Sequence, residues 1–302
     1  MMITAELVKE FARDEVDMIG IASANQFRDA PKGHKPADLL PGAKSVVVVG
    51  IALPKSVVKT APSVQFVDYC ETVEMRLRII SQKIALFLEK EGGDAFPFSP
   101  GGYSEDIPLL AAMDIKVVQE NPEPVVIGMD PFSHRHAAVL AGMGEISAGG
   151  YVVVPGFGPR IRFASIITTN YLEPDPLLKK DFSWGLLCRP DLCKLQCKKI
   201  CPSKAIQGDG TVSLYRCRHY RNPKQCTLDF FKEMEELRIK GVSAVQRAYI
   251  VKRKYPPHVL GRCYRCNHAC PVGLKQGFGP LEKDVRKMPF LEVRKQVLKN
   301  SR

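Results

Sequence analysis

Ten cysteines, most of them in two short runs, are the residues of this 302-residue chain whose spacing indicates chemistry. The first run is Cys188-x4-Cys193-x3-Cys197-x3-Cys201-Pro202, and the second is Cys263-x2-Cys266-x3-Cys270-Pro271. Cys217 lies between the two runs. Thiolates are soft, strongly donating ligands, and four close thiolates suit an iron–sulfur cube better than a hard cation. The spacing therefore predicts iron–sulfur clusters.

The proline after each run indicates how eight cysteines divide. In two-cluster ferredoxins the cysteine before proline binds the other cluster, because the chain turns away from its own cube there. We therefore predict two [4Fe–4S] clusters whose ligands are exchanged between the runs. One cluster would take Cys188, Cys193, Cys197 and Cys270, and the other would take Cys201, Cys217, Cys263 and Cys266.

Two other uses of these cysteines, zinc binding and disulfide formation, explain the sequence less well. Structural zinc would favour two C-x2-C pairs, whereas only Cys263 and Cys266 have that spacing, and zinc leaves both Cys-Pro endings unexplained. Disulfides are not expected, because no signal peptide precedes the chain and such close cysteines indicate metal in a reducing compartment. The remaining cysteines, Cys70 and Cys226, are interpreted as packing thiols.

The composition predicts one large and one small domain, because a 302-residue chain with 45% hydrophobic residues can bury a sizeable core. The boundary is expected near residue 177, which gives domains 1–176 and 177–302, with a helical insertion at about 226–257. The longest apolar stretch, Val46 to Leu53, is too short to cross a bilayer as a helix, and we expect a cytoplasmic protein.

Charge is divided unevenly between these parts. Residues 1–176 carry 16 Lys and Arg against 22 Asp and Glu, whereas residues 177–302 carry 28 against 10. A basic C-terminal part could offset the charge of the clusters, steer an acidic electron donor, or hold a nucleic acid.

The elements that must position the cysteines begin with a mixed first domain. Leu7, Phe11 and Ala12 share one face of a predicted N-terminal helix. A glycine-rich turn, Gly142-x-Gly144, lacks the strand before it and the helix after it that a dinucleotide site needs. The expected order indicates an α/β (α+β) sandwich built on one sheet: helix 4–17, strands 18–22 and 44–53, helix 65–91, a helix from Ser133 through Val139, and strands 151–154 and 163–168.

Three segments together resemble the epoxyqueuosine reductase and reductive dehalogenase superfamily: DPFSHRHAAVLAGMGEI, CKKICPSKAI and CYRCNHACP. The resemblance implies a nitroreductase-like α/β domain that holds base-off cobalamin, followed by a two-cluster ferredoxin-like domain. Electrons would pass from the outer cluster to the inner cluster and then to cobalt. The resemblance and the glycine-rich turn also suggest these residues around the cofactor: Asp130, Ser133, Arg135, Gly142, Met143, Gly144 and Arg160.

Two of the departures from that family bear on the substrate. Gly128 stands where epoxyqueuosine reductases carry the aspartate proposed as proton donor, and Asp130 lies two residues later. Only 32 residues follow Cys270, where those enzymes have helical repeats that help to hold tRNA. We therefore expect a divergent relative with a different substrate.

The first prediction is a cobalamin-dependent iron–sulfur reductase fed by a low-potential donor of the ferredoxin or flavodoxin type. One alternative is an electron-transfer or corrinoid-reactivating protein without its own substrate, and a second is a tRNA-modifying enzyme, which is not favoured. The candidate proton donors are Asp130, then Tyr103 and His134. Each has a simpler role as well: a turn or helix cap for Asp130, aromatic packing for Tyr103, and a core histidine for His134.

Overall fold

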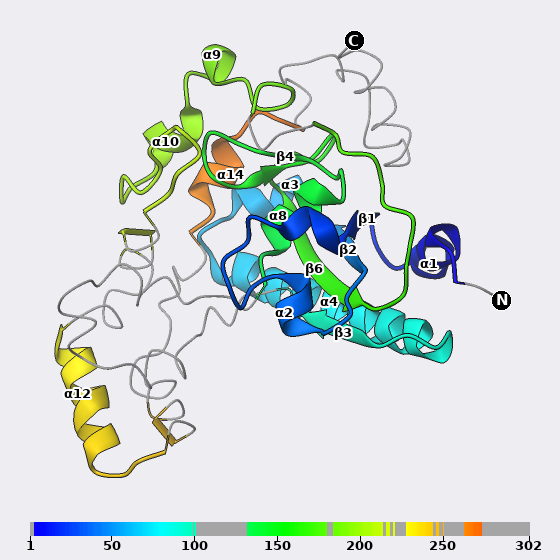
Figure 1. The fold of residues 1–302 in the computed structure, drawn as a ribbon. Helices are drawn as coiled ribbons and strands as arrows, with labels where there is room; N and C mark the ends of the chain where they lie inside the picture. The colour runs from blue at the N-terminus through cyan, green and yellow to red at the C-terminus, as the bar shows by residue number, and fades with distance from the viewer. Residues whose placement is uncertain are drawn as a thin grey trace.

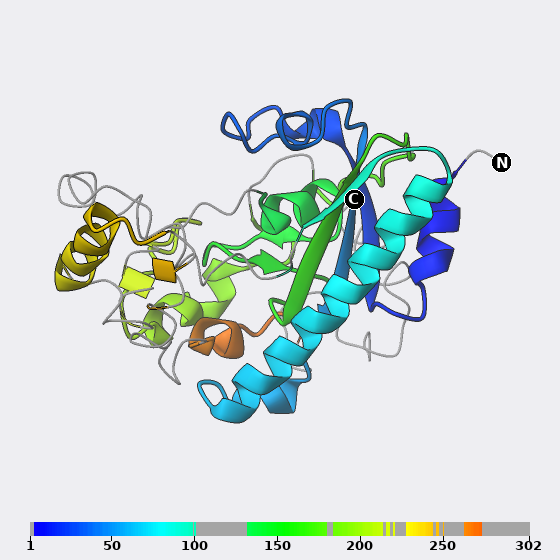
Figure 2. The ribbon, with the colours of Figure 1, turned by 90° about the horizontal axis from the view of Figure 1, so that it is seen from below.

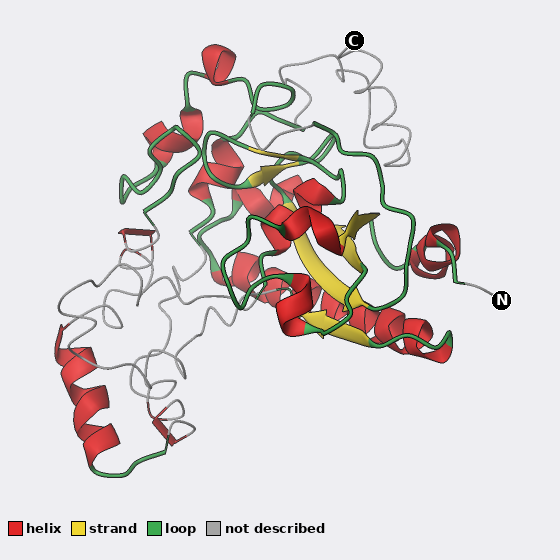
Figure 3. Cartoon of the chain, in the orientation of Figure 1, coloured by secondary structure: helices red, strands yellow, loops and turns green. Residues whose placement is uncertain are grey.

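The computed structural model describes residues 3–98, 100, 132–179, 184–213, 216–217, 220, 228–243, 246–247, 250 and 263–273. Figures 1 and 3 show a layered α/β part with a smaller, mostly helical and looped part beside it. The elements are α1 Ala5–Ala12, β1 Met18–Ser23, η1 Ala24–Phe27, α2 Pro36–Leu39, β2 Ser45–Ala52, α3 Lys55–Lys59, α4 Val64–Lys90, β3 Ala95–Phe98, α8 His134–Leu140, β4 Glu145–Ile146, β5 Val152–Val153, β6 Ile161–Thr168, α9 Pro190–Cys193, α10 Gln196–Ile200, α12 Leu228–Ile239 and α14 Arg265–Ala269.

A four-stranded antiparallel sheet of order β1-β2-β6-β3 forms the centre of the α/β part. Strand β2 is apolar and β-branched along most of its length and is buried on both faces, as its sequence predicts. In the sheet register Val48 lies opposite Gly20 on β1 and Ser165 on β6. The mixed α/β architecture predicted from the order of elements is confirmed.

Helices cover both faces of this sheet. Val47, Val49 and Ile51 point into one core shared with α1 and α4, and Val46 and Val48 point into a second core shared with α8. This alternation is the two-residue period of a β-strand. Figure 2 shows the long helix α4 lying across one face of the sheet, with α8 and the hairpin of β4 and β5 on the other.

The expectation of a single sheet is wrong, because β5 does not join the main sheet. It pairs with β4 in a separate antiparallel hairpin, in which Glu145 lies opposite Val153. Gly144 allows this close approach, since a Cβ atom there would lie 2.3 Å from the carbonyl oxygen of Val153. Pro155 follows β5 closely and has no N–H to donate, so it cannot extend a strand ladder.

Predictions for two local elements are also corrected. In α1 the buried residues are Ala5, Val8 and Ala12, whereas Leu7 and Phe11 are 40% and 42% exposed. The helix packs through its small side chains, which lets it lie close to its neighbours. The helix expected over residues 4–17 is also shorter, because α1 ends at Ala12. Strand β3 was not among the expected strands, and it accommodates Pro97 because it is an edge strand.

The cysteine-containing part packs onto the α/β part through a small apolar cluster that includes Ala148, Val153, Leu178 and Val272. Further along the chain, α12 confirms the helical stretch predicted around residues 227–239 and lies at the end of the molecule away from α1 (Figures 1 and 2). No helix in the described part of the chain is long and apolar enough to span a membrane.

Candidate metal centre

The two cysteine runs fold in the same way. In each, a residue in the left-handed region (Leu195 or Tyr264) precedes a five-residue helix, α10 or α14. Each helix ends at the cysteine before proline, Cys201 or Cys270, whose backbone is extended. A residue before proline is pushed out of the helical region by the proline ring. The Cys-Pro endings therefore end both helices and turn the last cysteine of each run away from its own helix.

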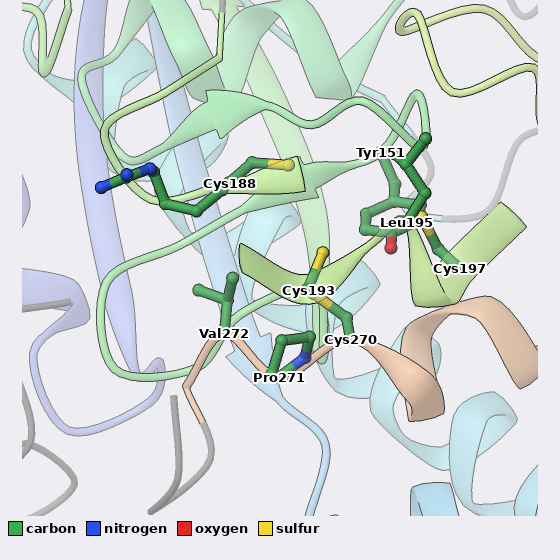
Figure 4. Close-up of a pocket in the computed structure, with 9 residues that line it drawn as sticks. Tyr151, Cys188, Cys193, Leu195, Cys197, Cys270, Pro271 and Val272 are labelled. Carbon is green, nitrogen blue, oxygen red and sulfur yellow. The ribbon is translucent and has the colours of Figure 1, made fainter. Parts of the chain in front are cut away.

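The four cysteines predicted for the first cluster line one cavity. Figure 4 shows Cys188, Cys193, Cys197 and Cys270 around it, with Tyr151 and Val272 completing the wall. The cavity is partly open to solvent. Three of the sulfur ligands come from the first run and one from the second, which is the exchange between runs that the prolines predict.

This arrangement fits a multi-atom cluster. Among the described residues no group of three or more His, Cys, Asp or Glu side chains is arranged to hold a metal ion. The four cysteines line one cavity, and their thiols are soft donors of the kind that iron–sulfur cubes require. The residues present therefore suit a [4Fe–4S] cluster.

The four cysteines predicted for the second cluster also come together. Burial raises the pKa of Cys266, and the neighbouring thiols of Cys217, Cys263 and Cys201 raise it further. The pKa of Cys201 is the exception: burial would raise it, but hydrogen bonds from Ser203 and nearby backbone N–H groups lower it. Each of these four cysteines is only partly buried, whereas three of the first four are buried.

Burial also raises the pKa of three thiols of the first group: that of Cys188 to about 12, that of Cys270 to about 11, and that of Cys197. A buried thiolate needs a positive partner, because removing its charge from water is costly. Metal binding supplies that partner and displaces the thiol protons. Without metal these cysteines are therefore neutral thiols, and binding of a cluster would require their deprotonation.

Glu145 holds the loop that carries Cys188. Its carboxylate is 1% exposed and accepts hydrogen bonds from the backbone N–H groups of residues 185 to 188. The bond from Leu187 is 2.8 Å long and that from Leu186 is 3.2 Å. Burial raises the pKa of Glu145, and these four hydrogen bonds partly oppose the increase. This role was not predicted from the sequence, although an acidic residue within the apolar, glycine-rich stretch AGMGEISAGG is a signal for it.

Arg160 fastens the second run to the α/β part. Its guanidinium is 3% exposed and donates to the carbonyl oxygens of Asn267 and Cys270, both at 3.1 Å, and to that of Val272. The side chain of Asn267 donates back to the carbonyl of Pro159 at 2.9 Å. Arg160 was expected at the edge of a corrin, but its hydrogen bonds in the structure go to the cluster loop.

The candidate cofactor residues on α8 make contacts within the protein. The Nδ1 atom of His134 lies 2.9 Å from the hydroxyl of Ser165, and Ser133 bonds to His136 at 2.7 Å rather than capping the helix. Arg135 donates to the carbonyl of Gly150 at 2.6 Å. The candidates Asp130 and Tyr103 lie outside the described residues, as do Gly128 and Cys226.

The glycine-rich turn is filled by protein atoms. Gly142, Met143 and Gly144 are buried. A Cβ atom on Gly20 of β1 would lie 2.7 Å from the carbonyl of Ala141 and 2.9 Å from Met143. The close approaches at Gly20 and Gly144 thus pack the turn against β1 and β5.

Comparison with known proteins finds two groups of relatives. The chain is 28% identical to a tetrachloroethene reductive dehalogenase of Desulfitobacterium hafniense over 221 residues, which are 72% of this chain and 33% of that protein. It is 22% identical to an epoxyqueuosine reductase of Lactococcus garvieae over 213 residues, 67% of this chain and 50% of that protein. The chain therefore spans about a third to a half of the length of these relatives. No protein-family model matches it.

Solved structures of the same two groups share the fold. The epoxyqueuosine reductase from Streptococcus thermophilus superposes with a TM-score of 0.52 at 17% identity, covering 89% of this chain and 66% of that one. A second solved structure is a reductive dehalogenase for which a mechanism of B12-dependent dehalogenation has been suggested. It superposes with a TM-score of 0.50 at 19% identity, covering 86% of this chain and 37% of that one. The fold and the relatives are those of a class of reductases. The chain is similar in sequence to reductive dehalogenases and to an epoxyqueuosine reductase, as its motifs predict, and it shares the fold of solved structures from both groups.

Proposed function

We propose that the chain is an iron–sulfur reductase that holds two [4Fe–4S] clusters and delivers low-potential electrons to a substrate-reducing centre. The observation that carries this proposal is the cavity lined by Cys188, Cys193, Cys197 and Cys270, which combines ligands from both runs. Two clusters suit such a reductase because donors supply one electron at a time, whereas reduction of a carbon–halogen or carbon–oxygen bond needs two.

The burial of the two sites supports a proposed direction of electron flow. The partly buried site of Cys201, Cys217, Cys263 and Cys266 would accept electrons from outside. The site of Cys188, Cys197 and Cys270 lies against the α/β part and would pass them inward. Residues 177–302 carry 28 Lys and Arg against 10 Asp and Glu, which favours docking of an acidic donor of the ferredoxin or flavodoxin type.

Cobalamin is the proposed substrate-reducing cofactor. Its support comes from the superfamily, in particular from the dehalogenase with a suggested B12-dependent mechanism. When bound, cobalamin supplies a strongly reducing cobalt centre that reacts with an electrophilic substrate. Asp130 remains the first candidate for the proton donor, followed by Tyr103 and His134.

One observation favours the alternative, an electron-transfer or corrinoid-reactivating protein. The turn from Gly142 to Gly144 is buried and packs against β1 and β5. In that case the first cluster would reduce a corrinoid held by a partner protein.

Anaerobic purification followed by metal analysis and cobalamin titration separates these possibilities. The proposal expects iron and sulfide in the protein, and retention of added hydroxocobalamin in base-off form at micromolar concentration in equilibrium dialysis. Clusters without cobalamin retention would leave the electron-transfer alternative as the function. Zinc without sulfide would contradict both.

A further inference from the structure

We propose that Tyr151 is a redox-tuning residue of the first cluster, whose hydroxyl group donates hydrogen bonds to the sulfur ligands Cys197 and Cys270. This inference rests on the iron–sulfur part of the proposed function and is independent of cobalamin. It assigns a role to a residue that carries no motif.

The position of Tyr151 supports this role. It directly precedes β5 and lines the same cavity as the four cysteines (Figure 4). Its side chain interacts with the thiols of Cys197, in the first run, and Cys270, in the second, and opposes the rise that burial causes in the pKa of each. Tyr151 thus lies where the two runs meet.

The backbone around Tyr151 is shaped for its ring. A Cβ atom on Gly149 would lie 2.6 Å from the Cε1 atom of Tyr151 and 3.2 Å from the sulfur of Cys197, so only glycine leaves room for both. Gly150 has a φ of +75°, which favours glycine, and its carbonyl is held by Arg135. The N–H of Ser147 donates to the carbonyl of Tyr151 at 2.8 Å. The turn therefore fixes the ring against the sulfur ligands.

A hydroxyl in this place would change the reduction potential of the cluster. Reduction adds negative charge to the cluster, and a hydrogen bond to a ligand sulfur stabilises the more negative state. The effect is strengthened because Leu195, Pro271 and Val272 line the same cavity with apolar groups. A phenol has an ordinary pKa of about 10, so it is a donor at neutral pH. Phenylalanine would pack in this position equally well. Removing the hydroxyl therefore distinguishes a redox-tuning role from a packing role.

The test is a redox titration of anaerobic wild-type and Tyr151→Phe proteins, followed by electron paramagnetic resonance. We expect both clusters to be retained, and the equilibrium constant for one-electron reduction of the first cluster to fall roughly tenfold, a midpoint about 59 mV more negative. The second cluster should keep its potential and serves as an internal control. Tyr171→Phe is the matched control variant, because Tyr171 is 62% exposed and its hydroxyl bonds to Glu173.

Unchanged midpoint potentials in Tyr151→Phe would overturn the proposal. If that variant fails to assemble the first cluster, site-specific 3-fluorotyrosine at position 151 decides, because fluorine makes the phenol a stronger donor without removing the ring. A shift of the first midpoint to a more positive potential would then support the role, and no shift would overturn it. A wild-type protein without iron would overturn the proposed function and, with it, this inference.

Discussion

Replacing Glu145 tests how the fold holds the first cysteine of the metal centre. The carboxylate accepts hydrogen bonds from four successive backbone N–H groups, and Leu187 and Cys188 are buried. In Glu145→Ala these two N–H groups lose their partner, at about 1–3 kcal/mol each. We therefore expect the free energy of unfolding to fall by about 2–6 kcal/mol, a large part of the roughly 5–15 kcal/mol typical of folded proteins.

The variant Glu145→Gln should lose less of the free energy of unfolding than Glu145→Ala. The Oε1 atom accepts from Gly185, Leu187 and Cys188, and an amide oxygen can keep these bonds, whereas the amide nitrogen cannot accept from Leu186. We expect a loss of about 1–3 kcal/mol.

Urea denaturation under anaerobic conditions measures both losses, and iron analysis shows whether the loop still delivers Cys188. Glu173→Ala is the control, because Glu173 is exposed and a surface change of this kind alters stability by about 0.5 kcal/mol or less. If Glu145→Ala keeps the wild-type unfolding free energy and iron content, the carboxylate does not organise the loop.

Three further variants test other contacts. Tyr264→Ala should lower stability by about 2–4 kcal/mol, because its ring lies 4.7 Å from the guanidinium of Arg162, whereas Tyr264→Phe should keep most of that contact in a thermal melt. Gly158→Ala should cost about 1–3 kcal/mol and release iron more readily to a chelator, since its Cβ would lie 2.0 Å from the carbonyl of Val272 and its φ is +61°. Cys70→Ala should lose about 1 kcal/mol and no iron, because Cys70 is a buried packing residue of α4, and iron loss would give it a ligand role.

Much of the fold could be predicted from local patterns. The apolar run of β2 identifies a buried strand, and the helical spacing of Val73, Leu77, Ile80 and Ile84 identifies the core face of α4. The four cysteines that line the cavity could be grouped from the sequence, because the spacing and the Cys-Pro endings are local features. The pairing of β5 with β4 could not be predicted, because two such short strands carry no signal of the strand that each pairs with.

The residues that support the site could not be found in this way. Glu145 contacts a loop about 40 residues later, and Arg160 contacts carbonyl oxygens 107 to 112 residues away. Backbone carbonyl and N–H partners leave no trace in the sequence, because every residue has them. Tyr151 was missed for the same reason: its neighbours Cys197 and Cys270 are brought to it only by the folded chain.

The most direct test of the account is the iron and sulfide content of anaerobic wild-type protein beside Cys270→Ala, Cys197→Ala and Cys266→Ala. The wild type should hold about eight iron atoms per chain and each variant about four. Because the runs exchange ligands, Cys270→Ala and Cys197→Ala should lose the same cluster and show the same remaining paramagnetic resonance signal, and Cys266→Ala should lose the other. Zinc in place of iron, or a Cys270→Ala protein that loses the same cluster as Cys266→Ala, would contradict the account.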